Sequence, residues 1–235
     1  MLASQPAPRS NIELWLALLT NLAITLVYLF VLAVWQEVPA ASGLFGHSIG
    51  ILGFTLMLMT EILYSIRKRS FNARWGRLSN WLRFHIFTGL VGPYMVLLHS
   101  SWKFNGLAGV VMLFTLIIVV SGFIGRYIYT AIPRTADGIE IESEQLSRYI
   151  AGIEAMLNQQ NAASSRNQEK TREIKRLQKR QTQLERQLSG LARARRGLAL
   201  WHTVHVPIGI VLFLSAFIHI IAAFYYATLA HLLGL

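Results

Sequence analysis

Five stretches of the chain are long and apolar enough to cross a lipid bilayer, and this feature limits the fold more than any other. A helix needs about 20 predominantly apolar residues to span a hydrocarbon core of about 30 Å. The sequence therefore predicts an all-α integral membrane protein whose five transmembrane helices form a bundle. The five stretches cover residues 12–35, 48–66, 81–100, 106–130 and 203–230.

The composition agrees with a membrane protein and narrows its chemistry. Hydrophobic residues make up 54% of the chain and charged residues only 14%, whereas a soluble domain carries about 25% charged residues. The chain has no cysteine, which excludes disulfides, thiolate zinc sites, iron–sulfur clusters ligated by this chain and thioether-linked haem. Any metal must therefore be held by His, carboxylate, Met or Tyr side chains.

The net charge of +11 is concentrated in two hydrophilic segments, 67–83 and 134–200. The connection 36–47 has no Lys or Arg, and the connection 101–105 has only Lys103. Because cytoplasmic loops are rich in Lys and Arg, we expect both basic segments on the cytoplasmic side of an inner, cytoplasmic membrane. The N-terminus is then inside and the C-terminus outside. Charge placed beside membrane spans reports topology, so no nucleic-acid partner is expected.

The segment 134–200 has the heptad pattern of a coiled-coil-like helical hairpin. It divides the chain into transmembrane helices 1–4 (1–133), the hairpin, and the fifth transmembrane helix (201–235). The second hairpin helix can continue into the fifth span, with Gly190 and Gly197 as places where it can bend. The seam residues are Leu146, Ile150, Ile153 and Leu157, then Ile174, Leu177, Gln181, Leu184, Leu188 and Leu191.

Two spans carry histidines at the same spacing. "HIFTGLVGPYMVLLH" begins at His85 and ends at His99, and "HVPIGIVLFLSAFIH" begins at His205 and ends at His219. Fourteen residues of α-helix turn to within about 40° of four whole turns and rise about 21 Å. Each pair therefore shares one helix face at two depths. Because the third and fifth spans run in the same direction, His85 is level with His205, and His99 with His219.

Two neutral imidazoles on facing helices can provide both axial ligands of a haem iron. A single membrane histidine often serves only as a hydrogen-bonding group between helices, but two matched pairs favour a functional role. We therefore expect two bis-histidine haems b. His202 is a rival ligand, although it lies about 100° away from the face of His219. His47 and His231 are interpreted as interfacial residues.

Small and cationic residues beside the histidines are the expected surroundings of the haems. Glycines leave room for a porphyrin edge between helices, and the haem propionates need cationic or donor partners at the membrane edges. The glycines are Gly89, Gly92 and Gly209. The partners at the edges are Arg83 on the inner side, and Trp102 and Lys103 on the outer side.

These matched H-x13-H pairs on two parallel spans resemble the cytochrome b of bc-type complexes. Their place on the third and fifth spans also resembles the ferric reductase-like transmembrane domain. The resemblance covers about 81–130 and 201–230, and it implies that the four histidines are haem ligands in a dihaem b-type cytochrome. Two features depart from it: the long hairpin, and the lack of a sixth span followed by a flavin- and nicotinamide-binding domain. NADPH oxidation is therefore not expected.

The expected function is transmembrane electron transfer by a cytochrome b subunit of a larger redox complex. Its partners would be other redox subunits, such as a flavoprotein, an iron–sulfur protein or a c-type cytochrome. One alternative is a quinol-oxidising or quinone-reducing membrane subunit, which would bind a quinone and use Glu61 or His202 as a proton group. A second alternative is a haem-free membrane scaffold. No catalytic residue is assigned, and the residues leave open whether the chain belongs to an enzyme.

Overall fold

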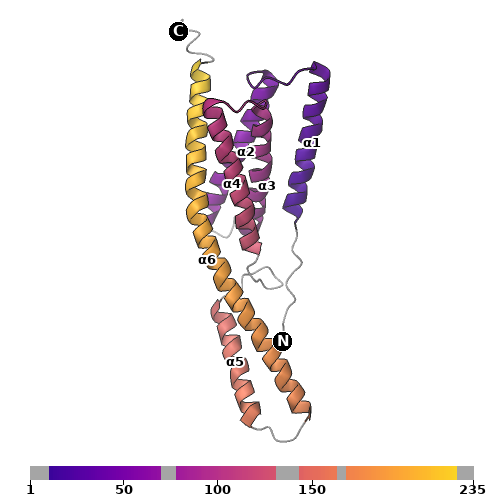
Figure 1. The fold of residues 1–235 in the computed structure, drawn as a ribbon, viewed down its shortest axis with the longest axis vertical. Coiled ribbons are helices and arrows are strands. Elements are labelled where there is room, and N and C mark those ends of the chain that lie inside the picture. Colours follow the sequence, from indigo (N-terminus) through magenta and orange to yellow (C-terminus); the bar gives the residue numbers. More distant parts are fainter. Residues whose placement is uncertain (1–10, 70–77, 131–142, 163–167, 227–235) are drawn as a thin grey trace. The chain divides into compact units, whose positions relative to one another are not determined.

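The computed structural model describes residues 11–69, 78–130, 143–162 and 168–226 (Figure 1). These residues form six helices and contain no strand, so the expected all-α class is confirmed. The helices are α1 (Ile12–Trp35), α2 (Leu44–Arg69), α3 (Leu78–His99), α4 (Gly106–Thr130), α5 (Ser143–Ala162) and α6 (Gln168–Phe224).

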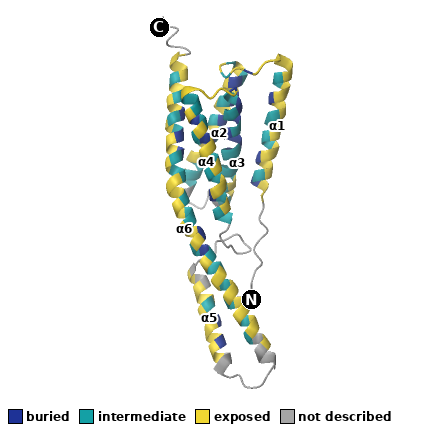
Figure 2. Ribbon diagram, in the orientation of Figure 1, coloured by how far each residue is buried: buried dark blue, intermediate teal, exposed yellow. Residues whose placement is uncertain are grey.

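Five of the described helices, α1 to α4 and α6, are long and apolar enough to cross a membrane. The expected bounds of the first and fourth spans agree with α1 and α4, while α2 and α3 each begin about one turn earlier than expected. Large apolar side chains such as Trp15 (63% exposed) and Phe30 (68% exposed) cover the outer face of α1 (Figure 2). Such a surface suits contact with lipid tails, which need no polar partner.

The second hairpin helix and the fifth span are one helix. α6 runs from Gln168 to Phe224 without a break, and it contains Gly190, Gly197 and Pro207. The two glycines therefore do not end the helix. The expected boundary between the hairpin and the last transmembrane segment, at 200 and 201, lies inside α6.

The chain divides into two compact units, one formed by 10–122 and 204–235 and the other by 1–9 and 123–203. In the latter unit, α5 lies beside the first part of α6 (Figure 1). Gln181 Nε2 on α6 donates a hydrogen bond to Glu154 Oε1 on α5 at 3.1 Å. Ile153 and Leu157, two residues of the predicted seam, are buried.

In the unit formed by 10–122 and 204–235, α2 and α3 pack closely because glycines of the two helices face each other. A Cβ atom on Gly53 would lie 2.9 Å from the backbone oxygen of Gly92, and a Cβ atom on Gly92 would lie 2.9 Å from that of Gly53. Close approach at small residues is the usual means of helix association in membranes, where the hydrophobic effect gives no driving force. One side chain–side chain hydrogen bond adds to this contact, from Thr60 Oγ1 to Thr88 Oγ1 at 2.7 Å.

The helix α1 packs against α3 in the same unit. Ala17 and Tyr28 of α1 form one buried cluster with Ile49 of α2 and with α3 residues that include Val91 and Met95. A hydrogen bond between Thr25 Oγ1 and Tyr94 Oη also joins α1 to α3. The face of α3 between the two histidines is thus packed against α1 and α2.

Candidate functional site

His85 lies on α3, and its imidazole is held by the backbone of α2. Its Nδ1 atom is 3.0 Å from the backbone oxygen of Thr60. A carbonyl oxygen only accepts, so Nδ1 carries the proton and Nε2 of the neutral ring keeps its lone pair. The ring also packs against Tyr64, with the ring centroids 5.0 Å apart. A nitrogen with a free lone pair and a fixed ring orientation is what a metal ligand needs.

His99 repeats this arrangement at the other end of α3. Its Nδ1 atom is 2.8 Å from the backbone oxygen of Gly46 in α2, so its Nε2 atom also keeps the lone pair. A Cβ atom on Gly50 would lie 2.7 Å from that Nδ1 atom, so the ring occupies space that only glycine leaves. The ring of His47 is 6.4 Å away, centroid to centroid. The position of His99 is therefore shaped by three residues of α2.

The two histidines of α6 have different surroundings. His205 Nδ1 is 3.0 Å from Ser121 Oγ on α4, and a hydroxyl can donate or accept, so this bond leaves the tautomer open. His219 is half-buried on α6. The pairing of His99 with His219 stays a prediction. His85 contacts α2, and His205 contacts α4.

The glycines expected to make room for haem lie against neighbouring helices. A Cβ atom on Gly89 would meet Thr60 Cγ2 at 3.5 Å, which is ordinary contact, and Gly92 packs tightly on Gly53. Gly209 faces α4, where a Cβ atom would lie 3.9 Å from Ile118 Cδ1. All three line the helix contacts that surround the histidines, and their role beside a porphyrin stays a prediction.

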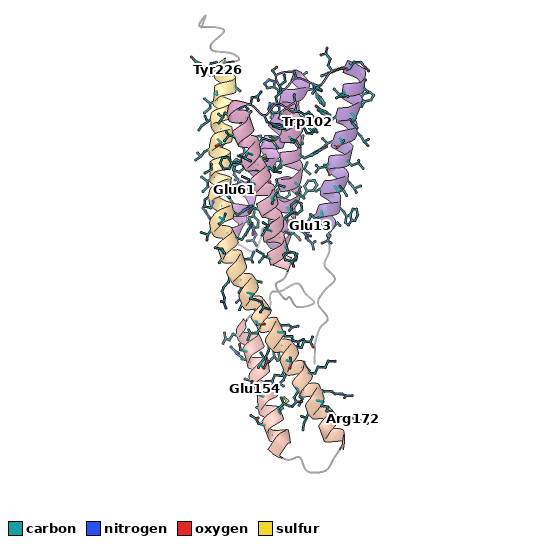
Figure 3. All side chains as sticks on the ribbon, in the orientation of Figure 1. Glu13, Glu61, Trp102, Glu154, Arg172 and Tyr226 are labelled. Carbon is teal, nitrogen blue, oxygen red and sulfur yellow. The ribbon has the colours of Figure 1, made fainter. Side chains whose placement is uncertain are left out.

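The expected polar partners at the two edges are exposed. Arg83 lies in the first turns of α3 and Lys103 in the connection after it, and both side chains are exposed. Trp102 is 59% exposed and stands in the same connection, where Ser101 and Trp102 have positive φ values of 49° and 61° (Figure 3). These residues are accessible to a group that reaches the ends of α3.

The two residues considered as proton groups are also exposed. Glu61 lies on α2, where Oε1 accepts a hydrogen bond from Ser65 Oγ at 3.4 Å (Figure 3). His202 is exposed on α6 and its ring is 6.2 Å from that of Trp201, centroid to centroid. Trp201 itself fills the space beside Gly125 of α4. His47 is also exposed, and its Nδ1 atom donates a hydrogen bond to the backbone oxygen of Gly43 at 3.2 Å. His231 lies outside the described residues.

Sequence reasoning missed the residues that hold the imidazoles. Thr60 and Gly46 act through their backbone oxygens, which every residue type carries, so no sequence signal identifies them. The sequence did contain a pattern that could have identified Gly50. Gly46, Gly50 and Gly53 follow the four- and three-residue spacing of one helix face. Ser121 had a weaker signal, as a small polar residue within an apolar span.

The donor chemistry fits an axially ligated haem iron. Within the described ranges, no three His, Cys, Asp or Glu side chains gather as they would around a metal ion held by side chains alone. A haem iron receives four nitrogens from its porphyrin and needs only two from the protein. Each α3 imidazole has its lone pair on Nε2 and can offer one nitrogen to a separate iron, and the second nitrogen for each iron is expected from α6.

Comparison with known protein families, with curated proteins and with solved structures gives no match to this chain.

Proposed function

We propose that the chain is a dihaem cytochrome b subunit that transfers electrons across a membrane. The observation that carries the proposal is the repeated geometry of α3, where His85 and His99 each donate from Nδ1 to a backbone oxygen of α2. Such an outer partner fixes the tautomer and orientation of a ligating imidazole and raises its basicity. His85 with His205, and His99 with His219, are the proposed axial pairs.

Each haem, when bound, supplies a reversible one-electron couple at the iron. The residues of this chain do the rest. Thr60 and Gly46 hold the two α3 imidazoles by their backbone oxygens, Ser121 holds His205, and Gly50 leaves the space that the His99 ring occupies. The ligand levels are about 21 Å apart along the helix axis, and apolar side chains between them exclude water and protons. An electron is then the charge that crosses.

The orientation belongs to the same proposal. The basic segments 67–83 and 134–200 lie on the cytoplasmic side, which places the C-terminus outside. The level of His85 and His205 is then the inner one, near Arg83, and the level of His99 and His219 is the outer one, near Lys103. The α5–α6 hairpin is the proposed docking element for a cytoplasmic redox subunit.

Haem content is the experiment that tests this function. Protein purified from a haem-supplemented culture should show the sharp reduced bands of bis-histidine b haem, and pyridine haemochrome analysis should give about two haems per chain. The His202→Ala variant should keep both haems, since His202 lies on a different face of α6 from His219. Protein that folds, inserts in the membrane and carries no haem would overturn the proposal in favour of a scaffold.

Transfer across the membrane needs its own measurement. Vesicles containing the oriented protein would be loaded with ferricyanide, which does not cross lipid, and a reductant such as dithionite would be added outside. We expect ferricyanide to be reduced at a rate that depends on the protein, and His99→Ala vesicles to lose that rate. The direction of electron transfer is set by the potentials of the donor and the acceptor. The membrane potential adds or subtracts about 2.3 kcal/mol per charge per 100 mV.

A further inference from the structure

One face of α6 changes from basic to apolar over two turns of the helix. Arg193, Arg196 and Leu200 are exposed, and their spacing of three and then four residues keeps them on one side of the helix. Leu200 is 71% exposed. We call these three residues the basic–apolar face. Two cations followed by an apolar side chain match a molecule whose anionic head is joined to a hydrocarbon tail.

Packing against α4 fixes the direction of this face. Leu191 and Ala194 of α6 are buried in a cluster that includes Ile128 and Tyr129 of α4, all within one compact unit. At 100° of rotation per residue, Leu191 and Ala194 lie on the side of the helix opposite to Arg193. The basic–apolar face is therefore turned away from α4, toward whatever surrounds the protein.

The two arginines of the face have no internal partner that the structure describes. Neither the Arg193 nor the Arg196 side chain forms an ion pair or a hydrogen bond with another described residue. The sequence contains no Asp or Glu after Glu185, so the charge of the face is not balanced from within this part of α6. Guanidinium groups bind phosphate oxygens in a bidentate way, so a phosphate is a suitable external partner.

The length of the apolar run that follows places the arginines at the depth of lipid phosphates. From Gly197 to Phe224 the chain has no Asp, Glu, Lys or Arg, and this length of helix rises about 42 Å. A bilayer is about 40–45 Å thick when its headgroup regions are included. We therefore expect Arg196 at the level of the headgroups. Trp201, a short way further along α6, suits the interface just below them.

The apolar end of the face decides between a lipid and a soluble acidic partner. Leu200 lies within the stretch that the bilayer surrounds, where a soluble protein does not reach it. Arg186 is the preceding basic residue on this side of α6, and it lies about 15 Å from Arg196 along the helix axis, beyond the headgroups. A soluble partner thus has access to Arg186 and the residues before it, whereas Arg193 and Arg196 are left to the membrane.

We propose that the basic–apolar face binds an anionic phospholipid. Arg193 and Arg196 donate hydrogen bonds to its phosphate, and Leu200 packs against the beginning of an acyl chain. A zwitterionic headgroup carries its own cation beside the phosphate, so it does not offset the charge of two arginines. Phosphatidylglycerol has the phosphate charge alone and does offset it. The site needs no haem, so it goes beyond the proposed electron transfer and does not depend on it.

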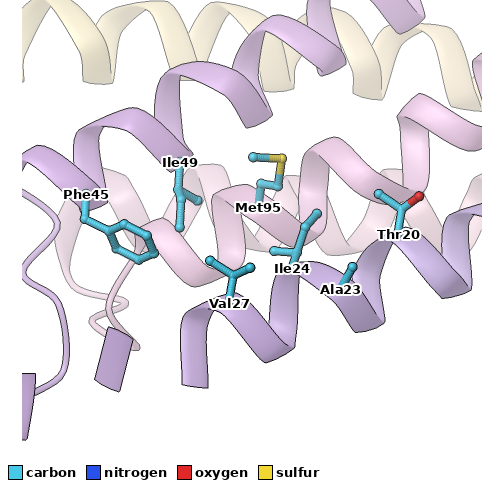
Figure 4. A pocket seen from close by; sticks show the side chains of 7 residues that line it. All are labelled: Thr20, Ala23, Ile24, Val27, Phe45, Ile49 and Met95. Carbon is cyan, nitrogen blue, oxygen red and sulfur yellow. The ribbon is translucent and has the colours of Figure 1, made fainter. Parts of the chain in front are cut away.

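Other surfaces of the protein give the reference for this selectivity. The outer face of α1 carries exposed apolar side chains such as Leu18, which is 57% exposed. An apolar cavity of about 280 Å³ lies between α1, α2 and α3, and of the seven side chains that line it only Thr20 is polar (Figure 4). These surfaces suit acyl chains, which all phospholipids share, and so they should not select a headgroup.

The test measures which lipids lie beside α6 in a bilayer. Because the chain has no cysteine, Thr203→Cys provides one thiol for a bimane fluorophore at an exposed position next to the face. The full-length protein is placed in phosphatidylcholine bilayers that contain phosphatidylglycerol or phosphatidylcholine with a nitroxide near the head of one acyl chain, which quenches bimane on contact. We expect at least about tenfold preference for phosphatidylglycerol at this position. Leu18→Cys is the reference, where we expect less than about threefold.

Arginine variants on the Thr203→Cys background locate the site. Changing both Arg193 and Arg196 to Gln should lower the preference to that of the α1 reference, since each arginine near an anionic surface contributes about fivefold in affinity. Arg195→Gln is the matched control, because Arg195 is exposed in the same stretch but lies on another side of the helix. It should change the preference by less than about twofold.

Four results would overturn the proposal. Equal quenching by the two nitroxide lipids would show that the face does not select a headgroup. An equal loss in Arg195→Gln and in the double variant would show a general positive field without a site. Displacement of the nitroxide lipid by millimolar inorganic phosphate, or by equimolar polyglutamate, would assign the face to a free anion or to an acidic protein. The comparison of the two lipids at 203 decides the question even where an arginine variant fails to fold.

Discussion

The Nδ1 atom of His99 lies 2.8 Å from the backbone oxygen of Gly46, so the imidazole of α3 is oriented by the main chain of α2. Four residues further along α2, Gly50 leaves the space into which the same ring fits. One helix thus provides both the hydrogen-bond acceptor and the room for the ring. The properties of the proposed outer haem should therefore respond to changes in α2 that touch no ligand.

Gly50→Ala tests that dependence. The new Cβ atom would lie 2.7 Å from His99 Nδ1, so the ring must move or the helices must separate, at a cost of about 1–3 kcal/mol. We expect loss or a shifted midpoint potential of the outer haem, with the inner haem intact, in a spectroscopic redox titration. Gly122→Ala is the control, because a Cβ atom there meets nothing within 4 Å. Identical titrations for both variants would show that Gly50 has no such role.

A matched pair of glycines on α3 tests how α2 and α3 pack. Gly92→Ala brings a Cβ atom to 2.9 Å from the backbone oxygen of Gly53, and we expect the free energy of unfolding to fall by about 1–3 kcal/mol. Gly89→Ala makes only an ordinary contact of 3.5 Å with Thr60 Cγ2. Its unfolding free energy should change by less than about 1 kcal/mol. Denaturation by sodium dodecyl sulfate measures both, and equal losses would contradict the close approach of the two backbones.

The helices were predictable from the sequence because an apolar segment in hydrocarbon must satisfy its backbone hydrogen bonds internally, and a helix does so. The bounds of α1 and α4 follow directly from hydropathy. The sequence allowed the second hairpin helix to continue into the fifth span but left a bend at Gly190 or Gly197 open, because each glycine weakens a helix by only about 1 kcal/mol. Ala194 and Leu191 are buried against Ile128 and Tyr129 of α4 between these glycines, and such packing outweighs the local preference.

The site was predictable in part. The histidine spacing identifies faces and depths, since helix geometry converts residue number into rotation and rise. It carries no information about which neighbour holds each ring. The acceptors at Thr60 and Gly46 are backbone atoms, and the apolar cavity between α1, α2 and α3 arises where three helices leave a space between them. Both depend on packing between helices, which a single sequence does not encode as a local pattern.

Because the chain has no cysteine, single cysteines can report its orientation without background. Arg180→Cys places a thiol at an exposed position of α6, and Lys103→Cys places one in the connection after α3. In intact cells, a membrane-impermeant maleimide should label the cysteine at 103 and leave the one at 180 unlabelled until the cells are lysed. Labelling of the cysteine at 180 in intact cells would place the hairpin outside and reverse the proposed topology.

The hairpin carries a basic surface suited to an acidic redox partner. Arg172, Lys179, Arg186 and Arg193 are exposed at intervals of seven residues on α6, and such a repeat keeps them on one face. Replacing 140–190 by a short linker should leave haem content unchanged. It should also remove any redox subunit that co-purifies, as should changing Arg172, Lys179 and Arg186 to Glu. A subunit that stays bound to both variants would show that it docks elsewhere.

A redox titration of the His99→Ala variant tests the central claim most directly. The absorbance of the reduced haem is followed against potential for the unaltered protein and for the variant at equal protein concentration. The account predicts two one-electron transitions in the unaltered protein and one in the variant, with about half of the haem lost, because it assigns His99 and His219 to one iron and His85 and His205 to the other. Two undiminished transitions in the His99→Ala protein would contradict the account.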